Sequence, residues 1–349
     1  MTPRIAVIGL GRMGKLHCRV LSEMPGVELA CVVDTDPDVL SKTARRYDVE
    51  GVADPAEAVD RVDAAIVAVP TSGHIDAARP FVAAGKGVLI EKPIAASSAA
   101  AEGLLELAER TGSVVQVGHT ERFNPAVMAI RRFGITPKFI EAHRISPFTF
   151  RSADVGVVLD MMIHDIDLVG MMVGGEPDRV EAVGVNVLGA PEDIANARLS
   201  FPGGCVANLT ASRLAIKTER KMRIFSESAY VSVDYAKRVG IVVNKSANLD
   251  LIQMAREMDA KDLAELASSV DYSRMVRFEE LKVENTVEPL RSQAEAFCRT
   301  IAEGADPVVT GREGLAAVRC AEAIVASIKA HHWDGDASDR VGLDILSKA

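Results

Sequence analysis

Val7-Ile8-Gly9-Leu10-Gly11-Arg12-Met13-Gly14 ends the first apolar run of the chain and carries glycines in the spacing G-x-G-x-x-G. Gly9 permits a tight turn out of a strand, Gly11 lets the backbone approach a pyrophosphate, and Gly14 lets the next helix pack closely. The amino terminus of that helix then faces the phosphate charge, which its dipole favours. The segment predicts a dinucleotide loop whose contact residues are Gly9, Gly11, Arg12, Met13 and Gly14.

A second apolar run, residues 27–33, ends at Asp34, which lies about 20 residues beyond Gly14. An acid at this spacing is placed to accept a hydrogen bond from the ribose 2′-hydroxyl of a dinucleotide. A 2′-phosphate would meet like charge there, so Asp34 favours NAD over NADP as the cofactor. Arg12 or Arg45 could soften that preference.

Strand and helix patterns alternate through the first third of the chain. The expected strands are 4–9, 27–33, 64–69, 87–90 and 114–117, and the expected helices lie near 12–24, 36–47, 73–84 and 97–111. The strand segments are continuously apolar and rich in β-branched residues, as strands covered by helices on both faces should be. The pattern predicts an α/β fold with a Rossmann doubly wound parallel sheet over residues 1–120, whose ligands bind at the carboxyl ends of the strands.

The alternation of strand and helix patterns ends after a helix expected at 125–133. Strand patterns then follow at 138–145, 179–188, 194–201, 205–213, 220–226, 229–234, 239–244 and 279–284. An amphipathic stretch at 249–270, two closing helices near 289–303 and 311–330, and a charged tail after Trp333 complete the chain. Residues 121–349 are therefore expected to form an α+β domain for substrate binding and oligomerisation, with a large, mostly antiparallel open sheet. One face of that open sheet needs to be covered, so the sequence predicts a homodimer or homotetramer in which the sheets pack on each other.

Composition and charge narrow the classes of protein to consider. The chain has 349 residues, of which 48% are hydrophobic and 26% charged, as in a soluble globular protein large enough for two domains. A net charge of −9 argues against nucleic acid as a partner, because phosphate binding needs a basic face. The five cysteines are scattered without a C-x-x-C pair, which predicts reduced thiols in a cytoplasmic protein.

Neither a membrane segment nor a metal site is expected. The first strand begins by residue 4, which leaves no room for a signal peptide. The longest apolar stretch, residues 155–175, would bury four ionisable side chains if it crossed a bilayer. The chain has no H-E-x-x-H motif and no Cys/His ligand set, so metal-free chemistry is expected.

Polar residues follow the later strands of the parallel sheet, in Val69-Pro70-Thr71, Ile90-Glu91-Lys92-Pro93 and Val117-Gly118-His119. Lys92 is expected at the nicotinamide end of the cofactor, where the positive ring would lower the pKa of its amine and fit it for acid/base chemistry. The alternative is a solvated surface lysine. His74 and His119 are expected to be hydrogen-bonding residues of the wall. The cofactor contacts expected on this rim are Pro70, Thr71, His74, Glu91 and Lys92.

Asp160 and His164 stand four residues apart in an apolar helical segment, so both project from one face. A carboxylate beside an imidazole orients it and raises its basicity, which suits removal of a hydroxyl proton. A structural His–Asp pair is the alternative. A cluster of basic residues further on allows two interpretations, an anion site for a phosphorylated substrate or a solvated strand edge; its members are Arg213, Lys217, Arg220, Lys221 and Arg223.

Five motifs together resemble the glucose-fructose oxidoreductase, inositol 2-dehydrogenase and rhizopine-catabolism (Gfo/Idh/MocA) family over roughly the whole chain. They are Gly9 to Gly14, Val69-Pro70-Thr71 with His74, Glu91-Lys92-Pro93, Gly118-His119 with Arg122-Phe123-Asn124-Pro125, and Asp160 with His164. The resemblance implies that Lys92, Asp160 and His164 flank the nicotinamide and the oxidised sugar carbon. Members of the family differ over whether the lysine or the histidine takes the proton, so both roles stay open.

Within that family, segments 158–167 and 210–213 resemble bacterial nucleotide-sugar 3-dehydrogenases that act on UDP-N-acetylglucosamine. This implies oxidation of a sugar C3 hydroxyl to a ketone, and it agrees with the basic cluster because a UDP-sugar carries a diphosphate. The alternatives are a dehydrogenase of a free polyol or simple sugar, such as inositol, and a catalytically silent NAD-binding regulatory protein. The expected substrate contacts are Lys92, Asn124, Arg144, His164, Arg213 and Lys217.

Overall fold

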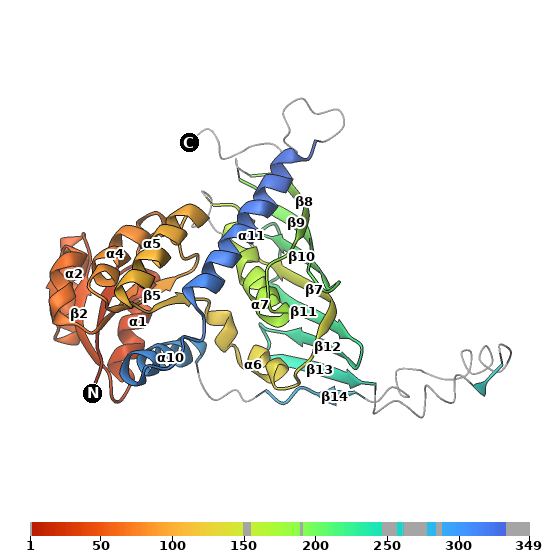
Figure 1. Cartoon of the computed structure of the whole chain (residues 1–349), viewed down its shortest axis with the longest axis horizontal. Helices are drawn as coiled ribbons and strands as arrows, with labels where there is room; N and C mark the ends of the chain where they lie inside the picture. Colours follow the sequence, from red (N-terminus) through yellow and green to blue (C-terminus); the bar gives the residue numbers. More distant parts are fainter. Residues whose placement is uncertain are drawn as a thin grey trace. The chain divides into compact units, whose positions relative to one another are not determined.

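The computed structural model describes residues 2–148, 155–188, 191–245, 257–259, 261, 278–283 and 288–332. These residues form two compact units, and Figure 1 labels many of their elements. The first unit holds residues 2–123, 158–171 and 288–332, and the second unit holds the remaining described residues. The first unit thus takes in two later segments beside the expected domain 1–120.

The first unit is built on a six-stranded parallel sheet in the order β3-β2-β1-β4-β5-β6. Its strands are β1 (Arg4–Ile8), β2 (Glu28–Val33), β3 (Glu50–Val52), β4 (Ala64–Val67), β5 (Gly87–Glu91) and β6 (Val115–Gly118). This order is that of a doubly wound dinucleotide-binding sheet, so the predicted fold class is confirmed. The sequence did not predict β3, which has three residues and is exposed at two of them, so it lacks a buried apolar run.

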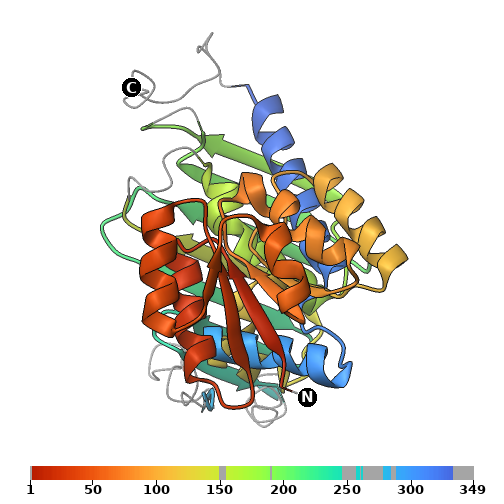
Figure 2. The ribbon, with the colours of Figure 1, turned by 90° about the vertical axis from the view of Figure 1, so that its left-hand side faces the viewer.

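Helices cover both faces of this sheet (Figure 2). They are α1 (Arg12–Glu23), α2 (Pro37–Tyr47), α3 (Pro55–Ala58), α4 (His74–Ala83), α5 (Ser98–Thr111), α10 (Pro289–Glu303) and α11 (Gly311–Ala330). The first unit also holds most of α7 (Ile163–Val173). On one face, Leu290 and Phe297 of α10 join the buried cluster of Val7 and Leu89. On the other face, a Cβ added at Gly314 of α11 would lie 2.5 Å from Val117, so this helix packs directly on β6.

The second unit is built on an eight-stranded sheet in the order β14-β13-β12-β11-β7-β10-β9-β8. Its strands are β7 (Pro137–Ile145), β8 (Arg179–Val185), β9 (Ile194–Ser200), β10 (Val206–Ser212), β11 (Glu219–Ser226), β12 (Ala229–Asp234), β13 (Val239–Asn244) and β14 (Glu279–Glu280). Neighbouring strands run antiparallel except β7 and β10, which are parallel. The expected mostly antiparallel sheet is therefore confirmed, and the short helix α6 (Pro125–Arg131) contacts β12.

The two faces of this sheet differ in burial because side chains alternate along each strand. On one face Ile140 and Ala142 of β7 are fully or almost fully buried. On the other face Phe139, Phe225 and Tyr230 form a half-exposed row, with ring centroids 5.7 and 4.9 Å apart. That aromatic row is one apolar part of the open face that the sequence predicts.

Parts of three sequence expectations lie outside the described residues: most of the amphipathic stretch 249–270, residue 284 at the end of the last strand, and the tail after Trp333. Among the described residues, no helix is both long and apolar enough to cross a membrane. All five cysteines are described, and none forms a disulfide.

Candidate functional site

The glycine loop between β1 and α1 has the shape of a phosphate cradle. Gly9 has a φ of +87°, and a Cβ there would lie 2.7 Å from Val69. A Cβ at Gly14 would lie 1.8 Å from the carbonyl oxygen of Gly9, whereas one at Gly11 would meet nothing within 4 Å. No side chain caps the amino terminus of α1, so its N–H groups are available to an anion. These residues fit the pyrophosphate of a dinucleotide.

Asp34 follows β2 beside this loop. One carboxylate oxygen accepts a hydrogen bond from Leu10 N at 2.6 Å, and the other accepts one from Asp36 N at 2.9 Å. A carboxylate has about four lone-pair sites, so the oxygens retain capacity for two ribose hydroxyls. The structure therefore places the acid next to the glycine loop, as its spacing predicts.

His74 links the ends of two strands on the same rim. Its Nδ1 lies 2.8 Å from Pro93 O, and its Nε2 lies 3.0 Å from Val69 O. Burial has the largest effect on the pKa of His74 and lowers it, whereas the two carbonyl oxygens act in the opposite direction. The ring thus fixes the residues after Lys92 to the loop that carries Pro70 and Thr71.

Lys92 and Asp160 come together in the first unit. The Nζ atom donates a hydrogen bond to the backbone oxygen of Asp160 at 2.8 Å and lies 3.4 Å from its Oδ1. The two side chains are 20% and 37% exposed, so both lie at the surface of the unit rather than in its core. Asp160 belongs to a π-helical turn, Val158–Met162, and the half-buried His164 lies in the first turn of α7, which follows directly.

Glu91 turns in the opposite direction from its neighbour Lys92. Its Oε1 lies 2.7 Å from Nε2 of His17, a fully buried residue of α1. A Cβ at Gly118 would lie 3.0 Å from Oε2 of Glu91, so the glycine leaves room for this carboxylate. His17 therefore ties the helix of the glycine loop to the strand that ends at Lys92.

In the second unit, the expected substrate residues belong to different elements. Asn124 caps α6 by accepting a hydrogen bond from Ala126 N at 3.1 Å, and its Nδ2 donates to Tyr235 O at 3.4 Å. Arg144 of β7 is 3% exposed and stands directly opposite Arg220 of β11. Two cations are thus paired across neighbouring strands on one face of the sheet.

The basic cluster does not form a single patch. Arg213 is 4% exposed; its Nε donates to Asp193 at 2.6 Å and its Nη1 to Val155 O at 2.8 Å. On β11, Arg220 points to one face, whereas Lys221 and Arg223 point to the other, where they lie near Glu219 and Glu141. Lys217 is exposed in the loop between β10 and β11. The strand alternation splits the cluster.

Known proteins match both units. Residues 3–119 match the model of an oxidoreductase family with an NAD-binding Rossmann fold, and residues 134–232 match that of a GFO/IDH/MocA C-terminal domain. The UDP-N-acetylglucosamine 3-dehydrogenase of Acidithiobacillus ferrooxidans is 34% identical over 245 residues, which cover 70% of this chain and 78% of the relative. The chain belongs to the Gfo/Idh/MocA family.

A second relative and a solved structure each span nearly all of this Gfo/Idh/MocA protein. The inositol 2-dehydrogenase of Rhizobium meliloti is 28% identical, covering 94% of this chain and 97% of the relative. The solved structure of UDP-N-acetylglucosamine 3-dehydrogenase GnnA from Acidithiobacillus ferrooxidans superposes with a TM-score of 0.83 at 28% identity, covering 95% of this chain and 99% of that one. The protein is therefore an NAD-dependent oxidoreductase, and both a nucleotide-sugar and an inositol enzyme are among its relatives.

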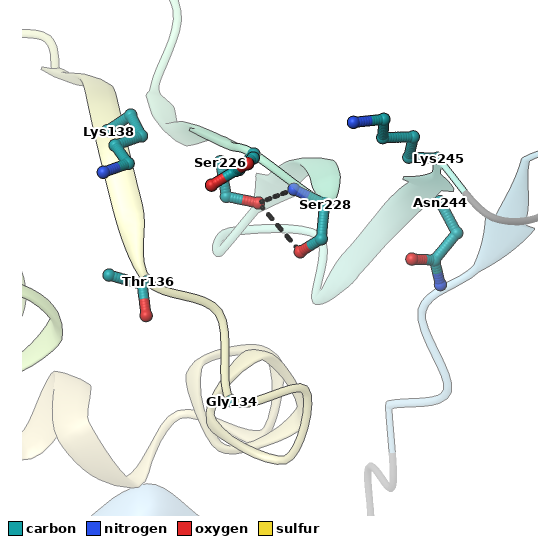
Figure 3. A pocket seen from close by; sticks show the side chains of 8 residues that line it. Gly134, Thr136, Lys138, Ser226, Ser228, Asn244 and Lys245 are labelled. Carbon is teal, nitrogen blue, oxygen red and sulfur yellow. Dashed lines mark hydrogen bonds between the residues drawn. The ribbon is translucent and has the colours of Figure 1, made fainter. Parts of the chain in front are cut away.

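One hollow of the second unit lies away from the residues expected to bind substrate. It has a volume of about 660 Å³ and is shown in Figure 3; its lining residues are Gly134, Thr136, Lys138, Ser226, Glu227, Ser228, Asn244 and Lys245. Lys138 stands near the beginning of β7, whereas Arg144 stands near its end. No residue that the sequence predicts in the site lines this hollow.

The structure adds two buried residues to the site that the sequence did not single out. His17 holds Glu91, and Arg122, noted only as part of a family motif, pairs with a carboxylate of α7. For His17 the available signal was a histidine three residues after Gly14, on a helix face otherwise lined by apolar residues. Within the described ranges, no group of three His, Cys, Asp or Glu side chains is arranged to hold a metal ion.

Proposed function

We propose that this protein oxidises the C3 hydroxyl of a UDP-N-acetylglucosamine-type nucleotide sugar to a ketone, with NAD as hydride acceptor. The observation that carries the proposal is the contact of Lys92 with Asp160, one turn before His164, in the unit that holds the dinucleotide loop. The likeness to the UDP-N-acetylglucosamine 3-dehydrogenase supports the choice of substrate.

The reaction removes a hydride from the carbon and a proton from its hydroxyl. When bound, NAD supplies the acceptor for the hydride. Lys92 and His164 are the two groups proposed to take the proton, because an amine and an imidazole both accept one near neutral pH when suitably placed. Asp160 holds Nζ of Lys92 through its backbone oxygen, and so fixes the direction from which the amine meets the hydroxyl.

For the diphosphate of the substrate, we assign Arg144 and Arg220. A guanidinium presents its donors in a planar fork that matches phosphate oxygens, so two of them directly opposite each other on β7 and β11 suit a diphosphate. Arg213 and Lys217 remain predictions as substrate contacts. The guanidinium of Arg213 already donates hydrogen bonds to Asp193 and to the backbone oxygen of Val155.

The proposal is tested by incubating the purified protein with NAD and, separately, UDP-N-acetylglucosamine, free N-acetylglucosamine or myo-inositol, and following NADH absorbance. We expect NADH with the nucleotide sugar and at least tenfold less with either free compound, because charge-assisted phosphate contacts each contribute about 1.5 to 3 kcal/mol. Turnover of inositol alone would instead support the polyol dehydrogenase that the Rhizobium relative represents. Binding of NAD without turnover of any compound would support a regulatory protein.

A further inference from the structure

Arg122 forms a buried ion pair with Asp167 in the first unit. It lies in the short helix η3 (Thr120–Phe123) after β6. Its Nε donates to Oδ2 of Asp167 at 2.8 Å, and its Nη2 donates to Oδ1 at 2.6 Å. The two side chains are 4% and 1% exposed. Such a two-point contact fixes direction as well as distance, because the guanidinium is planar.

A third donor of the same guanidinium reaches another helix. Nη1 of Arg122 donates to Oε1 of Glu313 at 2.5 Å. Glu313 forms a capping box with Thr310 at the start of α11, in which each residue bonds the backbone N–H of the other. Arg122 therefore joins the segment after β6 to α7 and to the beginning of α11, three parts of the chain far apart in sequence.

Asp167 lies three residues after His164 on α7, so the two side chains share one side of the helix. The π-helical turn Val158–Met162, which carries Asp160, comes directly before it. A π-helical turn holds one more residue than an α-helical turn, and a change between the two would rotate every residue on one side of it. Anchoring Asp167 selects one such arrangement, the one in which Asp160 meets Lys92.

We infer that Arg122 and Asp167 are positioning residues: their ion pair fixes the rotation and axial position of α7 and so holds Asp160 and His164 in the geometry that proton transfer requires. The inference rests on the proposed function. Neither residue contacts the reacting atoms. They act through the helix, and the bond to Glu313 braces Arg122 from the other side.

The first test exploits side-chain length. Arg122→Lys shortens the cation and removes the fork, Asp167→Glu lengthens the carboxylate, and the double variant restores the reach. We expect each single variant to lower kcat with UDP-N-acetylglucosamine at least tenfold while the Kd for NAD changes less than threefold, and the double variant to recover at least threefold of the lost kcat.

Loss of stability alone is excluded by a matched variant. Val231→Ala creates a cavity in the buried core of β12 in the second unit, and thermal unfolding shows how closely its Tm matches that of Arg122→Lys. We expect Val231→Ala to retain wild-type kcat below its Tm. An equal fall of kcat in both proteins would overturn the inference, and so would wild-type kcat in both single variants.

A second readout does not depend on the substrate. Amide hydrogen exchange over residues 163–173 reports the opening of α7, and we expect exchange at least tenfold faster in Arg122→Lys, with protection regained in the double variant. Unchanged exchange in the single variants would overturn the anchoring role. If the wild-type protein oxidises no nucleotide sugar, the proposed function fails while this measurement still decides whether the pair anchors the helix.

Discussion

Lys92 and Arg213 are two cations that the sequence predicts in a ligand site, and their surroundings in the structure differ. Lys92 of the first unit is 20% exposed and donates to Asp160, a residue predicted in the same site. Arg213 of the second unit is 4% exposed and its donors are directed at Asp193 and Val155. The partners therefore distinguish the two cations: Lys92 contacts another residue predicted in the site, whereas Arg213 donates to residues that are not.

The largest effect is expected from the first unit. Lys92→Met should lower kcat by about 10² to 10⁴, because acid/base groups act mainly in the transition state, and NAD affinity should stay within a few-fold. His164→Ala should have an effect of similar size, and Asp160→Asn a smaller one. Steady-state kinetics and NAD titration measure these changes. Wild-type turnover in Lys92→Met would show that the lysine is structural and would leave His164 as the candidate base.

The second unit should respond through KM. Replacing Arg144 and Arg220 together with Gln should raise KM for UDP-N-acetylglucosamine at least tenfold without altering the Kd for NAD, because each charge-assisted contact contributes about 1.5 to 3 kcal/mol. Lys221→Gln is the matched control, since this residue lies on the opposite face of β11. Arg213→Met should lower Tm instead, because it leaves Asp193 buried without its cation. If KM for UDP-N-acetylglucosamine rises only in Arg213→Met, then Arg213 forms the anion site and the assignment of Arg144 and Arg220 is wrong.

The cofactor preference tests the contacts of Asp34. NAD should bind more tightly than NADP, and Asp34→Ala should narrow the ratio of their Kd values by about tenfold, as expected for loss of one charge-assisted bond. Asp34→Asn removes the charge but keeps an oxygen that can accept the hydrogen bond from Leu10 N. Comparing it with Asp34→Ala therefore separates the effect of the lost charge from that of a disturbed loop. Equal affinities for the two cofactors in the wild-type protein would refute the assignment.

Stability should depend on pH through buried histidines of the first unit. Burial lowers the pKa of His119 below its usual value of about 6.5, so the folded state binds fewer protons than the unfolded chain. The contribution of the buried neutral ring to the free energy of unfolding is therefore fully present above about pH 6.5. It is lost as the pH falls below that value, by at most about 1.4 kcal/mol per pH unit for each group.

Urea unfolding at pH 7 and pH 5.5 measures this loss. His119→Gln should reduce this loss, because it removes the buried ring whose protonation opposes folding. Equal pH dependence in the wild type and His119→Gln would contradict the account.

The smallest effect on chemistry is expected at the half-exposed face of the second unit. We expect a second copy of the chain to cover the aromatic row of Phe139, Phe225 and Tyr230, forming a homodimer or homotetramer. Phe225→Asp should reduce the mass found by light scattering while leaving kcat within a few-fold. A wild-type protein that is monomeric at micromolar concentration would contradict this expectation.

The parallel sheet could be predicted because each of its long strands is a continuous apolar run, and because the glycine spacing marks the turn after the first of them. The mixed sheet could also be predicted as mostly antiparallel, but its parallel pair β7 and β10 depends on pairing between distant segments. Sequence spacing gives no signal for such a pairing. The short strand β3 could not be predicted, because it has no buried apolar run.

For the site, Lys92 and Asp160 could each be identified from a motif, but the hydrogen bond between them was not predicted, because the four-residue spacing indicated a pair of Asp160 with His164. The buried bonds of His17 and Arg122 could not be predicted, because their partners Glu91 and Asp167 lie 74 and 45 residues away in sequence. The basic cluster was predicted as one surface because its members are close in sequence. Alternation along β11 separates them in space.

The most direct test of the proposed reaction uses UDP-N-acetylglucosamine carrying deuterium at C3 of the sugar. Mass spectrometry of the reduced cofactor then shows which carbon gave up its hydride. We expect deuterium in the NADH formed, together with a keto group at C3 of the product. Unlabelled NADH formed from this substrate would contradict the account, because the hydride would then come from another carbon.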